Sequence, residues 1–442
     1  MRKAVTVVAG AAVLTVGLGA CGSNGQNSSS ASGSHIIHLT MWQQWGGGHE
    51  QAALNKIIAE YEKLHPNVRI TELPVTNDAK ILTAISGGTP PNIIDLGTSL
   101  EVGQWASKGA LMSLAPYIKK NRANTSVYVP AGLKAVTYNG QMYGLPFMNF
   151  DVGLLYNKAL FKAAGLNPNK PPTTTQQLQA DAYKLTKVSS NGTIEQLGFL
   201  PQYPGQSNGQ VTALEMLGWD YGGQWYQNGH VSANNPRNIA ALNWEASFYK
   251  KFGPQNMANF LRSAGAYLTA KDPFESGKLA MVYDGPWALD YAEANVPQLA
   301  KNLGVAPFPA PAGQSSRTGT TFIDTNPQVI PSGATHPNAA FKFIQWETTN
   351  PQVASMFATL VYNLPQLKNV PNFKLASDPR FRVFMQEADS ANAHVWPQLP
   401  ISTEYGVKLD EAQDAVLYGK ETAKQALDGL QQTISAALKQ SK

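Results

Sequence analysis

Ile36-Ile37-His38-Leu39-Thr40-Met41-Trp42 is the first β-prone stretch of the chain, and the pattern that follows it decides the fold class. Apolar residues at helical spacing then predict a helix over about 49–65, which His65-Pro66 ends because the residue before a proline avoids the α region. A second strand is predicted at Val68–Thr71, a second helix at Asp78–Ser86 and a third strand at Ile93–Leu96. This alternation is typical of an α/β protein with a sheet rich in parallel strands.

The same mixed pattern continues to the C-terminus. Short β-prone stretches lie at Gly153–Tyr156, Leu279–Tyr283 and Gly304–Ala306. Helices are predicted over about 174–187, 208–221, 236–251, 286–296, 337–348, 380–391 and 420–439. No internal repeat of solenoid length is present, so ordinary globular domains are expected.

Composition excludes several classes of protein. The chain has 442 residues, of which 43% are apolar and only 14% charged, so it can bury a large core and is not a disordered chain. Its formal net charge is +5, or 5 − 2 = +3 without Arg2 and Lys3. Because no stripe of clustered basic residues is present, no nucleic-acid partner is predicted.

The N-terminus predicts export. Arg2 and Lys3 precede an apolar run from Ala4 to Leu18 and the small pair Gly19-Ala20, which is the pattern of a secretory signal peptide over residues 1–20. The apolar run is shorter than the ~20 residues that a membrane-spanning helix needs.

Leu18-Gly19-Ala20-Cys21 resembles the lipobox of bacterial lipoproteins. The resemblance implies a lipid on Cys21, which is the only cysteine, so no disulfide is expected. Residues 21–35 are rich in Ser, Gly and Asn and are predicted to be a flexible lipidated tether. The expected location is the extracellular face of the cell membrane or the periplasm, with the lipid as the membrane contact.

Several blocks of sequence carry a family resemblance. In chain order they are Gly87–Ile94 (GGTPPNII), Tyr138–Pro146, Leu154–Phe161, Phe274–Met281, Asp284-Gly285-Pro286-Trp287 and Ala306–Pro309. Together they resemble the extracellular solute-binding proteins of bacterial sugar ABC importers, the maltose-binding-protein-like family. Asn92 stands where that family usually has an aspartate.

The resemblance implies an α/β, two-lobed periplasmic-binding-protein-like fold with a hinge and a ligand cleft between the lobes. The first lobe would combine residues 36–146 with 313–366, and the second 147–312 with 367–442. The implied function is to capture a sugar, expected to be an oligosaccharide, and to deliver it to the subunits of an ABC permease. A monomer with no cofactor and no metal is expected.

Sugars are bound by aromatic faces and by uncharged or ionic hydrogen-bonding groups, and open α/β sheets bind ligands beyond the carboxyl ends of their strands. Gln43, Gln44 and Trp45 follow the first strand in a glycine-rich loop and are predicted ligand contacts, whereas Trp42 is expected in the core. Asp95, Thr98 and Ser99 follow the third strand. Thr98 and Ser99 fit the role of helix caps equally well.

Other candidates lie in the second lobe or at its border. Asn149 and Asp151 sit at the predicted crossover and are either ligand contacts or part of a hinge turn. By resemblance, Trp287 is the stacking tryptophan of the family. Asp284 either accepts from a sugar hydroxyl or only forms a strand-end turn, and Tyr405 falls where the resemblance places a further aromatic contact. Trp219 and Trp225 are expected to pack in the second lobe.

The sequence gives little indication of an enzyme. The sequence has no H-E-x-x-H and no P-loop, and no catalytic residue is predicted. A secreted glycosidase, which needs only two carboxylates a few ångströms apart, stays an alternative, as does a solute-binding protein for a non-sugar ligand. The amide-rich loop around Gln43 and Gln44 favours a neutral ligand.

Overall fold

The structure, a computed structural model, describes residues 36–202 and 213–441, and Ile36–Lys442 form one compact unit. The predicted signal peptide, the tether with Cys21 and the start of the helix predicted from about residue 208 lie outside the described residues. Within the described part of the chain, no helix combines the length and apolar character that crossing a membrane requires.

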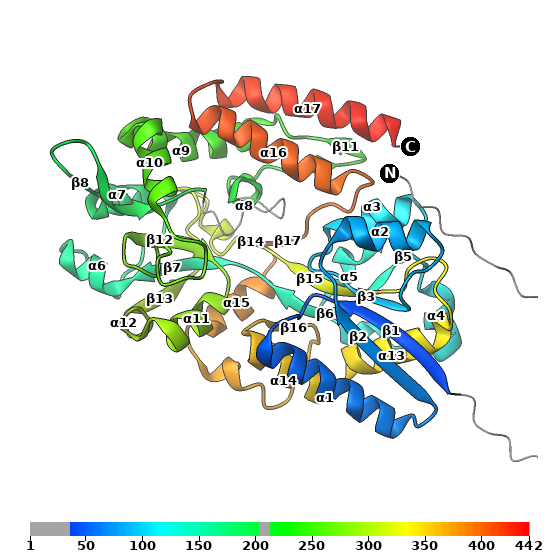
Figure 1. Cartoon of the computed structure of the whole chain (residues 1–442). Coiled ribbons are helices and arrows are strands. Elements are labelled where there is room, and N and C mark those ends of the chain that lie inside the picture. The colour runs from blue at the N-terminus through cyan, green and yellow to red at the C-terminus, as the bar shows by residue number, and fades with distance from the viewer. Residues whose placement is uncertain (1–35, 203–212, 442) are drawn as a thin grey trace, which may run out of the picture. The chain divides into compact units, whose positions relative to one another are not determined.

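Six strands form the first sheet, in the order β16-β6-β15-β3-β1-β2 (Figure 1). Their bounds are β1 Ile37–Gln43, β2 Val68–Pro74, β3 Ile93–Asp95, β6 Gly144–Phe150, β15 Asp324–Val329 and β16 Leu364–Pro365. β1 is parallel to β2 and β3, whereas β15 is antiparallel to β3 and β6. The sheet is therefore mixed rather than mainly parallel, because its later strands return from residues 324–365.

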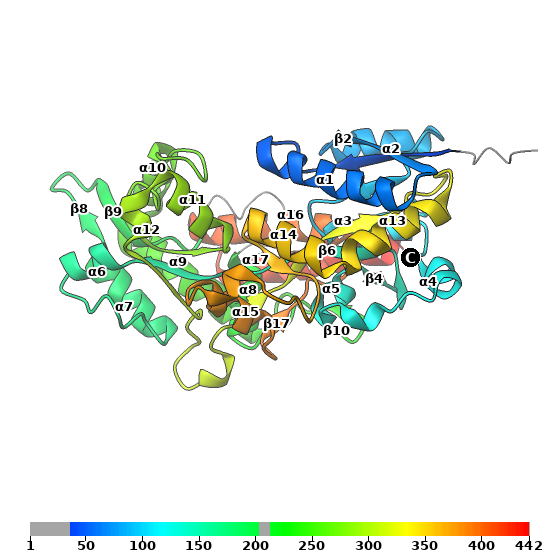
Figure 2. The same cartoon turned by 90° about the horizontal axis from the view of Figure 1, so that it is seen from below.

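Helices cover this sheet on its two faces. They are α1 Gly48–Leu64, α2 Asp78–Ser86, α3 Leu100–Ser107, α4 Ala115–Asn121, α5 Pro130–Ala135, α13 Pro337–Thr349 and α14 Pro351–Val361. α1, α13 and α14 lie together on one side (Figure 2). The apolar stripe predicted from the sequence is buried there, since Leu54, Ile57 and Tyr61 of α1 share a core cluster with Phe343 and Phe357.

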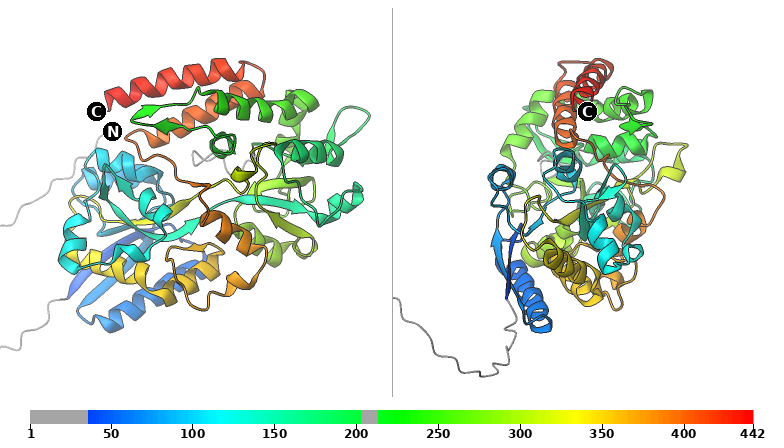
Figure 3. Two further views of the ribbon diagram at one scale, coloured as in Figure 1. Left: turned by 180° about the vertical axis from the view of Figure 1, so that it is seen from behind. Right: turned by 90° about the vertical axis from the view of Figure 1, so that its right-hand side faces the viewer.

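The second sheet has the order β13-β7-β12-β9-β8. Its strands are β7 Gly153–Asn157, β8 Lys187–Val188, β9 Ile194–Phe199, β12 Leu279–Asp284 and β13 Leu303–Ala306. The helices of this part are α6 Lys158–Ala163, α7 Thr175–Leu185, α8 Ala213–Asp220, α9 Pro236–Phe252, α10 Pro254–Ser263, α11 Trp287–Asn295, α12 Pro297–Ala300, α15 Phe381–Ala388, α16 Ser402–Leu417 and α17 Ala423–Gln440. α16 and α17 run side by side and pack with α9 (Figure 3). Trp219 and Trp225 are 3% and 1% exposed, which confirms their predicted packing role.

Two-stranded ribbons complete the fold. They are β4 Thr137–Tyr138 with β5 Gln141–Met142, β10 Tyr226–Gln227 with β11 His230–Val231, and β14 Thr321–Phe322 with β17 Ala393–His394. Asn139 and Gly140 have φ values of 46° and 74°, as the tight hairpin expected from their Asn-Gly sequence requires.

The chain passes between the two sheets three times, through residues 151–152, 307–323 and 366–380. Two of the segments are joined, because the Thr321 hydroxyl donates to the Val152 carbonyl oxygen at 2.8 Å. The lobe boundary predicted after residue 146 falls inside β6, since that strand continues to Phe150. The exact division of the chain into lobes stays a prediction.

Candidate ligand-binding site

Three of the predicted site residues meet at the carboxyl ends of β1 and β3. The indole nitrogen of Trp45 donates to one carboxylate oxygen of Asp95 at 2.9 Å, and the amide of Gln44 donates to the other at 3.3 Å. Gln328 of β15 adds a third donor to Asp95 at 2.9 Å. The Trp45 ring packs edge-on against Phe357 of α14, with ring centroids 5.0 Å apart. We call Gln44, Trp45 and Asp95 the first-lobe group.

Asp95 acts here as a fixed acceptor rather than as a free carboxylate. It is 2% exposed, and burial raises its pKa to about 7, although the hydrogen bonds from Trp45 and Gln44 lower it. Burial raises the pKa of Glu347 on α13 well above its usual range, and the nearby charge of Asp95 raises it further. Because Asp95 orients its two neighbours, the half-buried Trp45 and Gln44 are the members of this group with surface left for a ligand.

A second group surrounds Trp287, the first residue of α11. Its indole nitrogen donates to the hydroxyl of Tyr267, which donates to the Asp284 carboxylate at 2.7 Å. The backbone N–H of Gly285 donates to the same carboxylate oxygen at 2.8 Å. Asp284 is 1% exposed, so it fixes the tryptophan through Tyr267. Trp287, Tyr267 and Asp284 form the second-lobe group.

Phe150, the last residue of β6, adds an apolar wall next to the second-lobe group. Its ring lies 6.0 Å from that of Trp287 and 6.1 Å from that of Phe322, edge-on in both cases. Sequence reasoning missed both Phe150 and Tyr267. Phe150 directly follows the predicted contact Asn149, and alternation along a strand turns successive side chains to opposite faces, which is a signal that could have found it.

The two groups lie on elements that face each other between the lobes. His49, at the start of α1 just beyond Trp45, lowers the pKa of Asp290 on α11, although burial raises that pKa overall. Direct contacts run through α14, because its Phe357 packs on Trp45 and Tyr362 at its end donates to Glu293 of α11, the helix that begins with Trp287. This places the loop of the first-lobe group opposite the helix of the second-lobe group.

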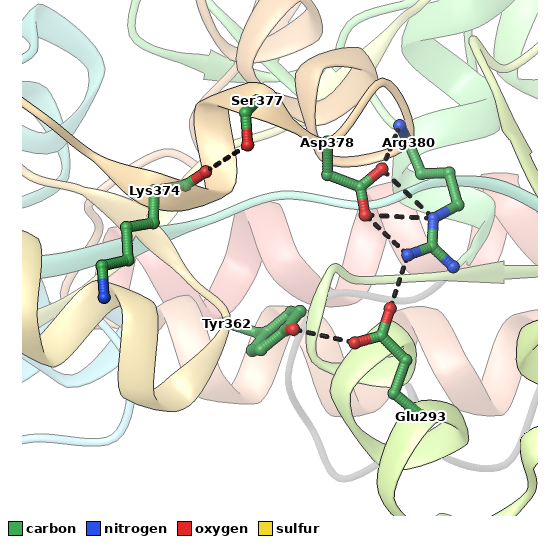
Figure 4. A network of polar contacts seen from close by, with 6 residues as sticks. All are labelled: Glu293, Tyr362, Lys374, Ser377, Asp378 and Arg380. Atoms are coloured by element: carbon green, nitrogen blue, oxygen red, sulfur yellow. Dashed lines mark hydrogen bonds and ion pairs between the residues drawn. The ribbon is translucent and has the colours of Figure 1, made fainter.

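A second contact joins α11 to the first lobe (Figure 4). Tyr362, which ends α14, donates its hydroxyl to the Glu293 carboxylate at 2.9 Å. Arg380 pairs with the other oxygen of Glu293 and with Asp378, the latter at 2.6 Å. Arg380 immediately precedes α15, which packs on β7 and β13 of the second sheet. Glu293 is thus held from its own lobe and accepts from Tyr362 of the other.

Three further predicted residues are buried near the same strand ends. Gln43 is fully buried, and its amide donates to Glu72 of β2 at 2.6 Å. The Thr98 hydroxyl accepts from the Leu100 N–H at 3.1 Å, and Ser99 stands at the N-cap position of α3, which has no side-chain cap hydrogen bond. The backbone N–H of Ser99 donates to Asp324 at 3.1 Å. Gln43, Thr98 and Ser99 are at most 3% exposed, so their contact with a ligand stays a prediction.

The remaining predicted residues lie apart from both groups. Asn149 lines a separate cavity of about 400 Å³ with Ile323 and Met385. Asp151 is fully buried, and burial followed by the charge of Glu387 raises its pKa well above the usual range. Tyr405 is also fully buried and donates to the Trp225 carbonyl oxygen at 2.8 Å, so its side chain packs in the second lobe and presents no surface to a ligand in this structure.

Metal ligands are not gathered in the described residues: in 36–202 and 213–441 no group of three or more His, Cys, Asp or Glu side chains could hold a metal ion.

Comparison with known proteins gives one family. The model of the family described as bacterial extracellular solute-binding protein matches residues 46–354. A structure of CpMnBP1 with mannotriose bound is 32% identical, with a TM-score of 0.78 over 90% of this chain and 99% of that one. The galactooligosaccharide-binding protein of Bacillus subtilis is 24% identical over 99% of this chain and 98% of its own length. The maltotriose-binding protein of Pyrococcus abyssi is 24% identical over 79% of this chain and 71% of its own length.

Proposed function

Since this chain belongs to the family of bacterial extracellular solute-binding proteins, we propose that it captures an oligosaccharide between its lobes and presents it to an ABC permease. The observation that carries the proposal is the pair of indoles, Trp45 and Trp287, each fixed by a buried carboxylate and placed on facing elements. Aromatic faces cover the C–H faces of sugar rings, and fixed rings lose little entropy on binding.

The chemistry of the two groups favours a neutral sugar. They offer indoles, an amide, a phenol and two carboxylates, and neither contains a lysine or an arginine that would attract a phosphate. The sugars are tested in the order of sequence identity between this chain and the relatives named for them. Structures of CpMnBP1 with mannotriose and mannobiose are 32% and 33% identical to this chain, so manno-oligosaccharides come first. Galacto-oligosaccharides and maltotriose follow, because the relatives named for them are 24% identical.

The test is calorimetric titration of the protein without its signal peptide against mannobiose, mannotriose and maltotriose. We expect saturable binding of one saccharide class and at least a tenfold loss of affinity, about 1.4 kcal/mol, for Trp287→Ala. Trp346→Phe on α13 is the matched control, since Trp346 packs against Tyr61 and belongs to neither group. Absence of binding to every neutral oligosaccharide, or an unchanged affinity of Trp287→Ala, would refute the proposal.

We also propose that the protein releases its ligand chemically unchanged. Asp95 and Asp284 each accept at least two hydrogen bonds from the protein and are at most 2% exposed, which does not suit the acid and base of a glycosidase. Chromatography of the bound saccharide after long incubation tests this point. Shortened products would favour the glycosidase instead.

The family description supports a location outside the cytoplasm, and we propose in addition that a lipid on Cys21 anchors a monomer to the outer face of the membrane. Cys21→Ala is expected to move the protein from the membrane fraction to the soluble fraction. An unchanged distribution between the two fractions would refute the proposed lipid anchor. Light scattering of the purified protein tests the proposed monomeric state.

A further inference from the structure

A cavity of about 440 Å³ lies in the first lobe beside Ile37, the first residue of β1. It is distinct from the candidate sugar site, because none of the residues of the two groups lines it. Its wall includes Tyr61, His65, Tyr117, Lys120, His336 and Lys342. These side chains come from α1, α4 and α13, which are far apart in the sequence.

The cavity is lined by basic side chains and by no acidic ones. Lys120 of α4 and Lys342 of α13 both line it, together with His65 and His336, whereas no aspartate or glutamate does. Within the described residues, no carboxylate lies within salt-bridge distance of either lysine. Two ammonium groups on different helices therefore line one space, and both lysines are exposed, so an anion that enters from solvent can reach both of them.

Tyr61 supplies a hydrogen-bond donor to the same space. Its ring is packed against His65, Phe343 and Trp346, with centroids 4.2, 5.0 and 5.2 Å away, and the residue is 2% exposed. No hydrogen-bond partner of its hydroxyl is found among the described residues. Because Tyr61 lines the cavity, its hydroxyl can donate to an acceptor held there.

The start of α13 opens onto the cavity as well. Pro337, Asn338 and Ala339 line it, and the N-cap residue His336 makes no side-chain cap hydrogen bond. The N–H groups of Ala339 and Ala340 bond to the His336 carbonyl oxygen. The N–H of Asn338 remains at the positive end of a 13-residue helix, where anions are favoured.

We propose that this cavity binds a phosphate group, carried by a small soluble molecule or by a phospholipid headgroup. A phosphate offers several acceptor oxygens and a negative charge that attracts both lysines. The volume leaves room for an organic part, for which Ile37 and Tyr117, stacked on Phe341 at 5.9 Å, provide an apolar wall. If Cys21 carries the proposed lipid, at most about 50 Å of extended chain separates it from Ile36, so headgroups are within reach.

The test uses the full mature chain at low ionic strength. Inorganic phosphate and glycerol phosphate are titrated by calorimetry, and co-flotation with vesicles of phosphatidylcholine containing phosphatidylglycerol is measured for the non-lipidated protein. Lys120→Gln combined with Lys342→Gln is expected to weaken binding at least tenfold, and Tyr61→Phe, which keeps the packed ring, at least threefold. Lys119→Gln is the matched control, because Lys119 lies on α4 but does not line the cavity.

Binding only to the soluble phosphates identifies a free ligand, and binding only to anionic vesicles identifies a headgroup; both support the proposal. The proposal is overturned if neither probe binds saturably, or if the double lysine variant binds as well as Lys119→Gln. All variants should bind oligosaccharide as the wild type does. A wild type that binds phosphate but no sugar would contradict the proposed function and leave this one standing.

Discussion

Tyr362→Phe removes a single hydroxyl from the contact between α14 and α11. In the structure this hydroxyl donates to Glu293 at 2.9 Å, and burial together with the Glu293 carboxylate raises the pKa of Tyr362 to about 12, so it is a donor at neutral pH. A hydrogen bond to a charged group contributes about 1.5–3 kcal/mol when buried. The Glu293 side chain is 38% exposed, so we reduce this to about 1 kcal/mol.

Because the contact joins the two lobes, it stabilises the arrangement in which they are close together. A sugar held between the lobes favours the same arrangement, so losing about 1 kcal/mol should weaken sugar affinity about fivefold. Calorimetry gives the affinity, and stopped-flow tryptophan fluorescence should show the loss mainly as faster dissociation. Thermal unfolding of the sugar-free variant checks that the fold is intact.

Tyr291→Phe is the control, because Tyr291 lies on α11, the helix of Glu293, and its hydroxyl makes no hydrogen bond with the described residues. A double-mutant cycle with Glu293→Gln isolates the pair, and the two changes should be less than additive. The reasoning is refuted if Tyr362→Phe binds sugar as tightly as the wild type, or if the control loses as much affinity.

Three further predictions concern other parts of the molecule. Tyr267→Phe removes the acceptor of the Trp287 indole but keeps a ring of the same shape, so titration should show sugar affinity falling about fivefold, and thermal stability should fall as well because the buried Asp284 loses a donor. Burial raises the pKa of Asp95 to about 7, above the usual ~3.9 of an unfolded chain; the folded state therefore binds the proton more tightly, and stability falls as pH rises from about 4 to 7. Urea midpoints across that range should fall less steeply in Asp95→Asn, and equal slopes would contradict this. A Cβ on Gly198 would lie 2.0 Å from the Ala182 carbonyl oxygen, so Gly198→Ala should lower the free energy of unfolding by at least about 2 kcal/mol, whereas Gly429→Ala, with open space around it, should raise it by about 0.5–1 kcal/mol; urea denaturation of both variants decides.

Elements with strong local signals could be predicted from the sequence. α1 and α2 lie within one residue of their expected bounds, because an apolar stripe defines each and a proline or a glycine pair ends it. α14 was missed although Asn350 caps it by accepting from the Gln352 and Val353 N–H groups. α16 was also missed, and it begins without any side-chain cap, so its position depends on packing against α9 and α17.

The site could be predicted only in part, for a related reason. Gln44, Trp45 and Asp95 come together because neighbouring parallel strands end at the same edge. The support that Tyr267 gives to Trp287 comes from an irregular loop with no motif, so no sequence pattern announces it. Tyr405 has a rotational position on α16 that turns it toward the second-lobe core, and a local match cannot reveal that orientation.

The place of β15 has a consequence for biosynthesis. This strand lies between β6 and β3 in the sheet, yet it consists of residues 324–329, which follow both neighbours by more than 170 residues in the sequence. Until those residues leave the ribosome, the first sheet exists only as two separate fragments with open edges. The first sheet is therefore completed only after residue 329 has been synthesised, which suits a polypeptide that folds outside the cytoplasm.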